Sequence, residues 1–404
     1  MVWASVVVSS TGDGMFITAF PLLAATLTGD PLLIAGVTMA SRLPWLLFSM
    51  ITGAVADRMD RRRLMIGADV VRFVIVGVLG VAIAVDAADI WLLYGCAFLL
   101  GTGETLHVNA AQGILPSLVP AVDLMEANAR FSTAQVASAQ FVGPPLGAAL
   151  FNSAASLPFL ADAVSFAGSA ALVASVPDEH AVEPPTTRLL DDVRDGLRFM
   201  HHHVGLRRMT EMLAVINFFY FSATSLLVLY VADVLHTGKI VYTLTLLGTA
   251  AGTVASRWFV ARLATRFGAV HTLLFSFWAW AVTMVGLALT SSGVVAVLLF
   301  VAMGLGNGLW LVVNTTIRQQ LTPRRLLGRM NAAFRTVSWG AVPFGAAFGG
   351  LVARTWGLRA PFVAAAVAHV LVALFARPLL RPVVAAVAER DRQLADEVRT
   401  DRRT

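Results

Sequence analysis

We single out five ionisable residues inside long apolar runs, where a charge is costly. Asp13, Arg42 and Glu104 lie near the middle of such runs, Asp162 lies one to two turns into another, and Arg257 lies toward one end of its run. An ionisable residue at the centre of a membrane helix costs about 2.5–3.5 kcal/mol, so each of these needs a reason. We expect Asp13, Arg42 and Glu104 to meet in one buried cluster.

A buried cluster of two acids and one arginine could bind and release protons. A carboxylate held there titrates near physiological pH if desolvation outweighs the attraction of its arginine partner. We therefore predict proton coupling, with Asp13 or Glu104 as the carrier and Arg42 setting the pKa of the acid it faces. The alternative is a permanent structural salt bridge. The outer position of Asp162 favours a structural role for that residue.

The composition places these residues in a membrane protein. The chain has 404 residues, of which 57% are hydrophobic and 13% are charged. A soluble domain carries about 25% charged residues, so this chain could not cover a water-facing surface. No aromatic and basic motif for nucleic-acid binding accompanies the net charge of +6. The single cysteine, Cys96, excludes an internal disulfide and a cysteine-based metal site, and we predict no metal and no cofactor.

Twelve apolar runs, each of about 20 residues, predict twelve membrane-spanning helices. They cover residues 3–27, 32–55, 66–86, 90–115, 130–152, 157–176, 210–234, 240–262, 270–290, 293–316, 331–352 and 359–377. We therefore expect an all-α membrane protein, located in the plasma membrane.

Arginines gather after every second run, whereas the alternate loops are nearly bare. Because positive charge marks the cytoplasmic side, both termini are expected in the cytoplasm. Lys239, Arg354 and Arg359 break this pattern. The arginines that establish it are Arg58, Arg61, Arg62, Arg63 and Arg72 after the second run, Arg188, Arg194, Arg198, Arg207 and Arg208 after the sixth, Arg262 and Arg266 after the eighth, and Arg318, Arg324, Arg325 and Arg329 after the tenth.

The twelve runs divide into two similar halves. Asn109 and Asn314 occupy equivalent positions in the fourth and tenth runs, and Asn128 and Asn331 open the fifth and eleventh. We predict an N-terminal six-helix half (1–176), a cytoplasmic linker (177–208), a C-terminal half (209–378) and a cytoplasmic tail (379–404). Within the linker, residues 188–204 read as an amphipathic surface helix. The three adjacent histidines at 201–203 cannot share one helical face, which favours a solvated helix end over a metal site.

Uncharged polar residues recur at helical spacing in three further places. They are Asn217 and Tyr220 in the seventh run, Asn307, Trp310 and Asn314 in the tenth, and His107 one turn beyond Glu104 in the fourth. Aromatic residues, including Phe16 and Phe20, surround them in the sequence. A pocket of this kind suits a large, mostly apolar ligand, and we predict that these residues bind the substrate.

Two short motifs resemble those of the major facilitator superfamily of transporters. The stretch from Gly53 to Arg63 resembles the loop between its second and third helices, although Asp60 stands where the family usually has glycine. In that family the loop latches the cytoplasmic side, which assigns this role to Gly53, Asp57, Arg58, Arg61, Arg62 and Arg63. The Gly-Pro-x-x-Gly pattern in the fifth run resembles the motif of exporters, and comprises Gly143, Pro144 and Gly147.

The whole chain is similar to the exporter branch that includes the enterobactin exporter and the macrolide-efflux proteins. This resemblance implies two six-helix pseudo-repeat halves in which the first, fourth, seventh and tenth helices line a central cavity. It implies proton-coupled efflux of a hydrophobic or amphipathic small molecule by a protein that we expect to be monomeric. Proton-coupled uptake on the same fold is the alternative. A membrane enzyme or a sensor is disfavoured, because neither a catalytic constellation nor a soluble domain is evident.

Overall fold

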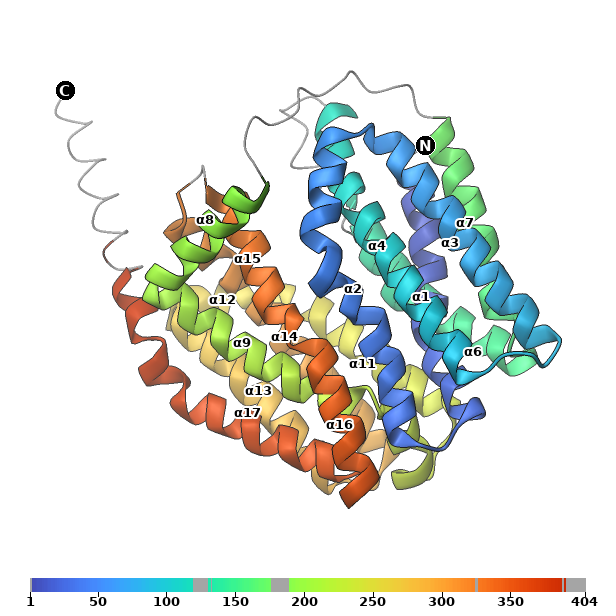
Figure 1. The fold of residues 1–404 in the computed structure, drawn as a ribbon. Helices are drawn as coiled ribbons and strands as arrows, with labels where there is room; N and C mark the ends of the chain where they lie inside the picture. Colours follow the sequence, from blue (N-terminus) through green and yellow to red (C-terminus); the bar gives the residue numbers. More distant parts are fainter. Residues whose placement is uncertain are drawn as a thin grey trace. The chain divides into compact units, whose positions relative to one another are not determined.

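Every regular element that the structure describes is a helix (Figure 1). The computed structural model describes residues 2–118, 130–131, 133–175, 189–323, 326–386 and 389. Its contacts separate two compact units. The first comprises the described residues of Met1–Thr187, with Phe221–Leu247 and Val342–Leu358; the second comprises those of Arg188–Tyr220, Gly248–Ala341 and Arg359–Thr404.

All twelve predicted spans contain helix, which confirms the all-helical fold. Among the residues described, eight helices are long and apolar enough to cross a membrane, or nine if one bent pair counts as a single span. The first six spans contain α1 (Val2–Leu27), α2 (Pro31–Arg58), α3 (Arg61–Ala84), α4 (Ile90–Leu118), the π-helix η1 (Ala137–Val142) with α6 (Gly143–Ser153), and α7 (Leu157–Ala174). The last six contain α9 (Val204–Thr224) with α10 (Leu227–Leu229) and η2 (Tyr230–Val234), α11 (Lys239–Ala255) with α12 (Arg257–Phe267), α13 (Ala269–Leu289), α14 (Gly293–Leu321), α15 (Leu327–Gly340) with α16 (Val342–Trp356), and α17 (Ala360–Leu379).

Several spans are interrupted, which the hydropathy of the sequence does not predict. The helix α9 is bent by 45° relative to the α10–η2 segment that follows it. The break between α11 and α12 falls at Ser256, whose hydroxyl donates to the Thr253 carbonyl at 2.7 Å, a local bond that competes with the helical ladder. In the fifth span, Pro144 and Pro145 have no N–H to give, and the preceding turn is a π-helix whose cap N–H, from Gly143, bonds to the Ser138 carbonyl.

Helix α1 packs tightly on α6 through the glycines of the predicted exporter motif. A Cβ added to Gly147 would lie 2.6 Å from the Met15 carbonyl oxygen, and Gly143 lies against Gly14 in the same interface. No side chain larger than hydrogen fits at such a crossing without movement of the backbone. Gly143 and Gly147 therefore set the distance between the two helices, while Pro144 follows the π-turn.

Helix α16 packs against α2 within the first unit (Figure 1). A Cβ added to Gly350 would lie 2.9 Å from the Leu32 Cα. At the same end, Arg354 lies 3.6 Å from Asp30, whose carboxylate also caps α2 by accepting from the Leu32 N–H at 2.9 Å. A close backbone approach and an ion pair thus join the start of α2 to the end of α16.

In the second unit, helix α8 (Leu189–His202) is attached to α15 (Figure 1). It occupies the segment in which the sequence predicts an amphipathic helix. Arg329 donates to the Asp195 carboxylate at 2.9 Å, and Gly196 touches the Arg329 backbone so closely that a Cβ would collide with its carbonyl oxygen. The linker helix is therefore docked on α15.

Candidate functional site: a buried charge cluster in the first unit

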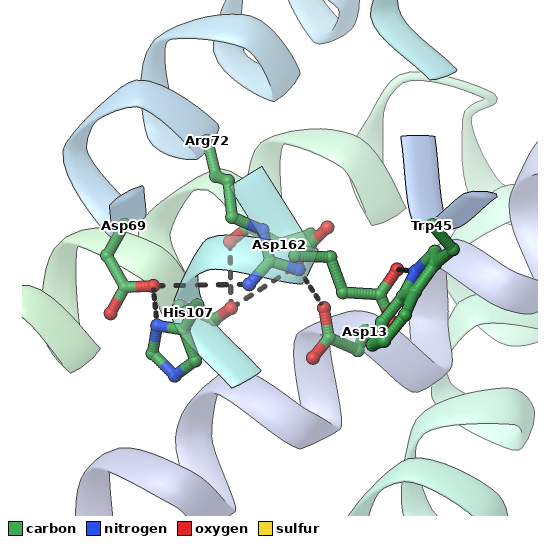
Figure 2. Close-up of polar contacts among 8 residues, drawn as sticks. Asp13, Trp45, Asp69, Arg72, His107 and Asp162 are labelled. Atoms are coloured by element: carbon green, nitrogen blue, oxygen red, sulfur yellow. Dashed lines mark hydrogen bonds and ion pairs between the residues drawn. The ribbon is translucent and has the colours of Figure 1, made fainter. Parts of the chain in front are cut away.

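Arg72 lies at the centre of a buried polar cluster (Figure 2). One of its terminal nitrogens lies 2.5 Å from a carboxylate oxygen of Asp13, and its side chain is only 6% exposed, against 36% for Asp13. Arg72 was grouped with the arginines that follow the second run, and its expected place in the loop was wrong. It lies near the middle of α3, where hydrocarbon would otherwise surround it, so an acidic partner is required.

Two features make room for the Arg72 side chain. Gly103 of α4 faces its stem, and a Cβ added there would lie 2.9 Å from the Arg72 Cγ. The guanidinium carbon lies 3.9 Å from the centre of the Phe166 ring on α7, a cation–π contact. Gly103 of α4 and Phe166 of α7 therefore accommodate the Arg72 side chain where it reaches Asp13 of α1.

Asp69 and His107 form a second pair beside Arg72 (Figure 2). Asp69 lies one turn before Arg72 on α3, and its side chain is fully buried. His107 Nδ1 lies 2.9 Å from Asp69 Oδ1, and Arg72 lies 4.0 Å from the same oxygen. Neither Asp69 oxygen has a well-aligned hydrogen bond among the described residues, so the pair is a close contact between two titratable side chains.

Glu104 and Asp162 complete the cluster. The indole N–H of Trp45 donates to Glu104 at 3.3 Å, and the Ser165 hydroxyl donates to Asp162 Oδ1 at 3.2 Å. Gly12 of α1 lets Asp162 approach, because a Cβ there would collide with its carboxylate. Asp162, which is 1% exposed, thus lies in the same cluster as the predicted proton-coupling acids. The four carboxyl groups that act electrostatically on Arg72 are those of Asp13, Glu104, Asp69 and Asp162.

The structure brings Asp13 and Glu104 to one cluster but supplies a different arginine. No ion pair joins Arg42 of α2 to either acid in the part of the chain described, and Arg72 of α3 takes the expected position. Asp69 was also missed. The signal was present, since Asp69 and Arg72 are an acid and a base three residues apart inside one apolar run, a spacing that puts both on one helix face.

Three predicted substrate-binding aromatic residues lie in helix contacts. Phe16 and Phe20 stack at 4.3 Å between ring centres, and both meet the edge of Phe159 on α7. In the second unit Trp310 of α14 is 6% exposed and packs against two aromatic residues of α13, Phe277 at 5.2 Å and Trp280 at 5.7 Å. Phe20 and Trp310 are thus buried, whereas Phe16 is half-buried.

The remaining predicted residues are spread over α9 and α14, with His107 in the cluster of the first unit. Asn217 donates to the Ser338 carbonyl of α15 at 2.8 Å. Asn314 is 2% exposed, and its Oδ1 has no hydrogen-bond partner within the described ranges. Tyr220 and Asn307 are half-buried.

The predicted latch forms local and helix-capping contacts. Asp60 caps α3, since its carboxylate accepts from the Arg63 N–H at 3.1 Å, which accounts for an acid at this position. Arg62 donates to the Val173 carbonyl at 3.2 Å and to that of Ala174, at the end of α7, where a cation complements the helix dipole. The remaining members have these positions: Gly53 lies near Asn109, Arg58 is exposed, Arg61 is half-buried at the start of α3, and the side chain of Asp57 lies outside the description.

The adjacent histidines end helix α8. His201 and His202 are exposed, whereas His203 is half-buried and its Nδ1 accepts from the Leu206 N–H at 3.3 Å, which caps α9. Burial lowers the pKa of His203 below its usual value, because the charged form loses hydration. Among the described residues, no group of three or more His, Cys, Asp or Glu side chains could hold a metal ion.

Sequence comparison finds relatives over nearly the whole chain. A family model described as "Transmembrane secretion effector" matches residues 1–401. Macrolide efflux protein A of Streptococcus pyogenes is 22% identical over 370 residues, covering 89% of this chain and 90% of that protein. Multidrug efflux pump Tap of Mycolicibacterium fortuitum is 26% identical over 385 residues, covering 91% and 92%.

A solved structure shares the fold. The crystal structure of a bacterial homologue of the iron transporter ferroportin, in its inward-facing state, matches with a TM-score of 0.75 and 15% identity over 94% of this chain and 97% of that one. At this identity the similarity shows the fold alone, and it confirms the predicted major facilitator fold.

Proposed function

We propose an export function for this chain, which belongs to the transmembrane secretion effector family of the major facilitator superfamily. It is a multi-pass membrane transporter of a small molecule and not an enzyme. We propose that it exports a hydrophobic or amphipathic compound, such as a drug, an antibiotic or a siderophore, in exchange for protons. The names of the relatives, a macrolide efflux protein and a multidrug efflux pump, support this direction and this substrate class.

The charge of the buried cluster carries the proposal of proton coupling. With all four acids ionised and His107 neutral, one arginine would face four carboxylates, for a net charge of −3. Such an excess in a membrane interior is expensive, because water does not screen it there. The cluster must therefore hold protons, and their number can change when a neighbouring group moves.

Asp13 is the preferred proton carrier within this cluster. It is the more exposed partner of its ion pair, so it can exchange a proton with water while Arg72 stays buried. Protonation removes the charge that Arg72 faces and weakens the link between α1 and α3. Glu104, which accepts from Trp45, is the second candidate.

Residues that keep partial exposure are the better candidates for substrate contact. We propose that Phe16 in the first unit, and Asn217, Tyr220 and Asn307 in the second, contact the exported molecule. The buried residues of the predicted set stabilise helix packing instead, as Trp310 does against α13. Aromatic and amide side chains together suit a ligand that is mostly apolar with a few polar groups.

The arginine-rich turn between α2 and α3 supports the proposed orientation. By the positive-inside rule it lies in the cytoplasm with both termini, and the protein lies in the plasma membrane. We propose that Asp57 and the neighbouring arginines latch the cytoplasmic side during alternating access. Asp57→Asn should then slow transport without abolishing substrate binding; unchanged transport rates in proteoliposomes would rule this role out.

The decisive experiment measures substrate-triggered proton movement in proteoliposomes that contain a pH-sensitive dye. A panel of lipophilic drugs and siderophores should change the luminal pH, and the signal should vanish in Asp13→Asn or Glu104→Gln. Arg42→Gln is the matched control, because no ion pair joins Arg42 to the cluster among the residues that the structure describes, and it should retain the signal. Proton and substrate moving in opposite directions indicates export; the same direction indicates uptake. A silent panel with folded, inserted protein would contradict proton-coupled transport.

A further inference from the structure

We propose that Asp69 and His107 form a second proton-binding site, and that it competes with Asp13 for their shared neighbour Arg72. This inference rests on the proposed proton coupling and extends it from one carrier to two opposed sites. Protonation of Asp13 would favour release of the proton held by Asp69 and His107, and release of the Asp13 proton would favour its return.

The burial of the pair requires a proton on it. Asp69 is fully buried, and His107 Nδ1, 2.9 Å away, is its nearest charged or chargeable contact. A buried carboxylate beside a neutral imidazole would be poorly compensated. One proton therefore resides on the pair, as an imidazolium beside a carboxylate or as a carboxylic acid beside a neutral ring. His107 is 12% exposed and Asp69 is not exposed at all, so the proton exchanges with water through the imidazole.

Arg72 connects the two sites because its two terminal nitrogens face different acids. One lies 2.5 Å from Asp13 and the other 4.0 Å from Asp69. When Asp13 binds a proton, the guanidinium loses its nearer partner and can approach Asp69. A closer guanidinium balances the negative charge of the Asp69 carboxylate. The positive charge on His107 is then no longer stabilised, and His107 gives its proton to water. The reverse shift restores the first arrangement, and one proton is bound for each one released.

The position of the pair gives the exchange a direction. Helix α3 runs from Arg61 to Ala84, and Asp69 lies one turn closer to the Arg61 end than Arg72 does. On α4, His107 likewise lies one turn beyond Glu104 toward the C-terminal end. The second site is thus displaced from the Asp13–Arg72 pair toward the arginine-rich turn, the side proposed as cytoplasmic.

Other charges in the cluster do not replace the competition between the two sites. Glu104 accepts a hydrogen bond from Trp45 of α2, and Asp162 accepts one from Ser165. Arg72 is the cation that both sites share. The ionisable groups that face it are Asp13 from α1, Asp69 from α3, Glu104 from α4 and Asp162 from α7, with His107 from α4 acting on Asp13.

The test is a histidine titration by NMR on the full-length protein in nanodiscs, with 15N-labelled histidine. Comparison with His107→Gln assigns the His107 signal. In Asp13→Asn, which mimics a protonated Asp13, the midpoint of the His107 titration should move to lower pH than in the wild type. The signal of His271, exposed on α13 in the second unit, should not move. An unchanged His107 midpoint would overturn the competition.

Transport measurements separate this inference from the proposed function. In His107→Gln the amide can still face Asp69 but cannot carry a proton. Substrate exchange without a gradient should persist, whereas uphill transport driven by a pH gradient should slow about tenfold or more. Asp69→Asn should likewise retain substrate exchange and slow uphill transport. Unaltered NMR signals from the other histidines would show that this variant is folded. If the wild type moves protons and His107→Gln transports substrate uphill at the wild-type rate, the proposed second site is wrong and the proposed function stands. If the wild type moves none, the proposed function fails.

Discussion

Gly143 and Gly14 face each other where α6 crosses α1, and a Cβ added to Gly143 would lie 2.5 Å from the Gly14 Cα. The neighbouring atoms belong to backbone, so they cannot turn aside as a side chain could. Gly143→Ala should therefore lower the free energy of unfolding by about 1–3 kcal/mol, the usual cost of overpacking. Thermal unfolding in detergent, followed by size-exclusion chromatography, measures the effect.

The control for this prediction is Gly95→Ala on α4. A Cβ added at Gly95 meets no atom within 4 Å, and alanine is favoured over glycine in a helix by about 1 kcal/mol. This variant should be as stable as the wild type or more so. Equal stability of the two variants would mean that the α1–α6 crossing adjusts freely.

Loss of Arg72 should destabilise the protein more than loss of Asp13. Arg72→Gln leaves several buried acids without their cation, which costs about 3–5 kcal/mol. In Asp13→Asn the guanidinium keeps Asp69 as a partner at 4.0 Å, so the cost should be smaller. The double variant should recover part of the loss, and thermal unfolding of all four proteins gives the interaction energy. A double variant as unstable as the sum of the single changes would contradict the pairing.

The contact between α2 and α16 should depend on packing rather than on its ion pair. Arg354 is 57% exposed where it meets Asp30, so Arg354→Gln should change stability by less than about 1 kcal/mol. Gly350→Val should cost more, because its side chain would press on the Leu32 backbone. Unfolding curves for the two variants measure the two losses of stability. A larger loss in Arg354→Gln than in Gly350→Val would contradict this prediction.

The junction of α8 and α9 should loosen in mild acid. Burial holds the pKa of His203 below its unfolded value, so the neutral ring contributes stability that is present above about pH 6.5 and declines as the pH falls below it. Protonation of Nδ1 also removes the cap on Leu206. Hydrogen exchange of this junction should accelerate at pH 5 relative to His203→Asn, which can cap without titrating. Equal exchange in both proteins at pH 5 would argue against the cap.

Much of the fold could be predicted because hydropathy records which segments lie in the membrane. Every predicted span contains helix, yet the break at Ser256 and the π-turn before Gly143 were not predicted. Hydropathy averages over about 20 residues, whereas these interruptions depend on a few hydrogen bonds. The acids Asp13 and Glu104 could be chosen from their depth in apolar runs. Their arginine could not, because the rotation of α2 and α3 decides whether Arg42 or Arg72 faces them.

The docking of α8 on α15 changes what a probe attached to the linker would report. Asp195 and Gly196 both contact Arg329, so α8 and the start of α15 should move together as one rigid body. Arg198 is exposed, so it can be replaced by cysteine and labelled with a fluorophore. The label would then report the motion of α15, and not independent motion of a flexible linker. A label on the amphipathic helix α8 would thus measure the rate at which the membrane-embedded helix α15 changes position during the transport cycle.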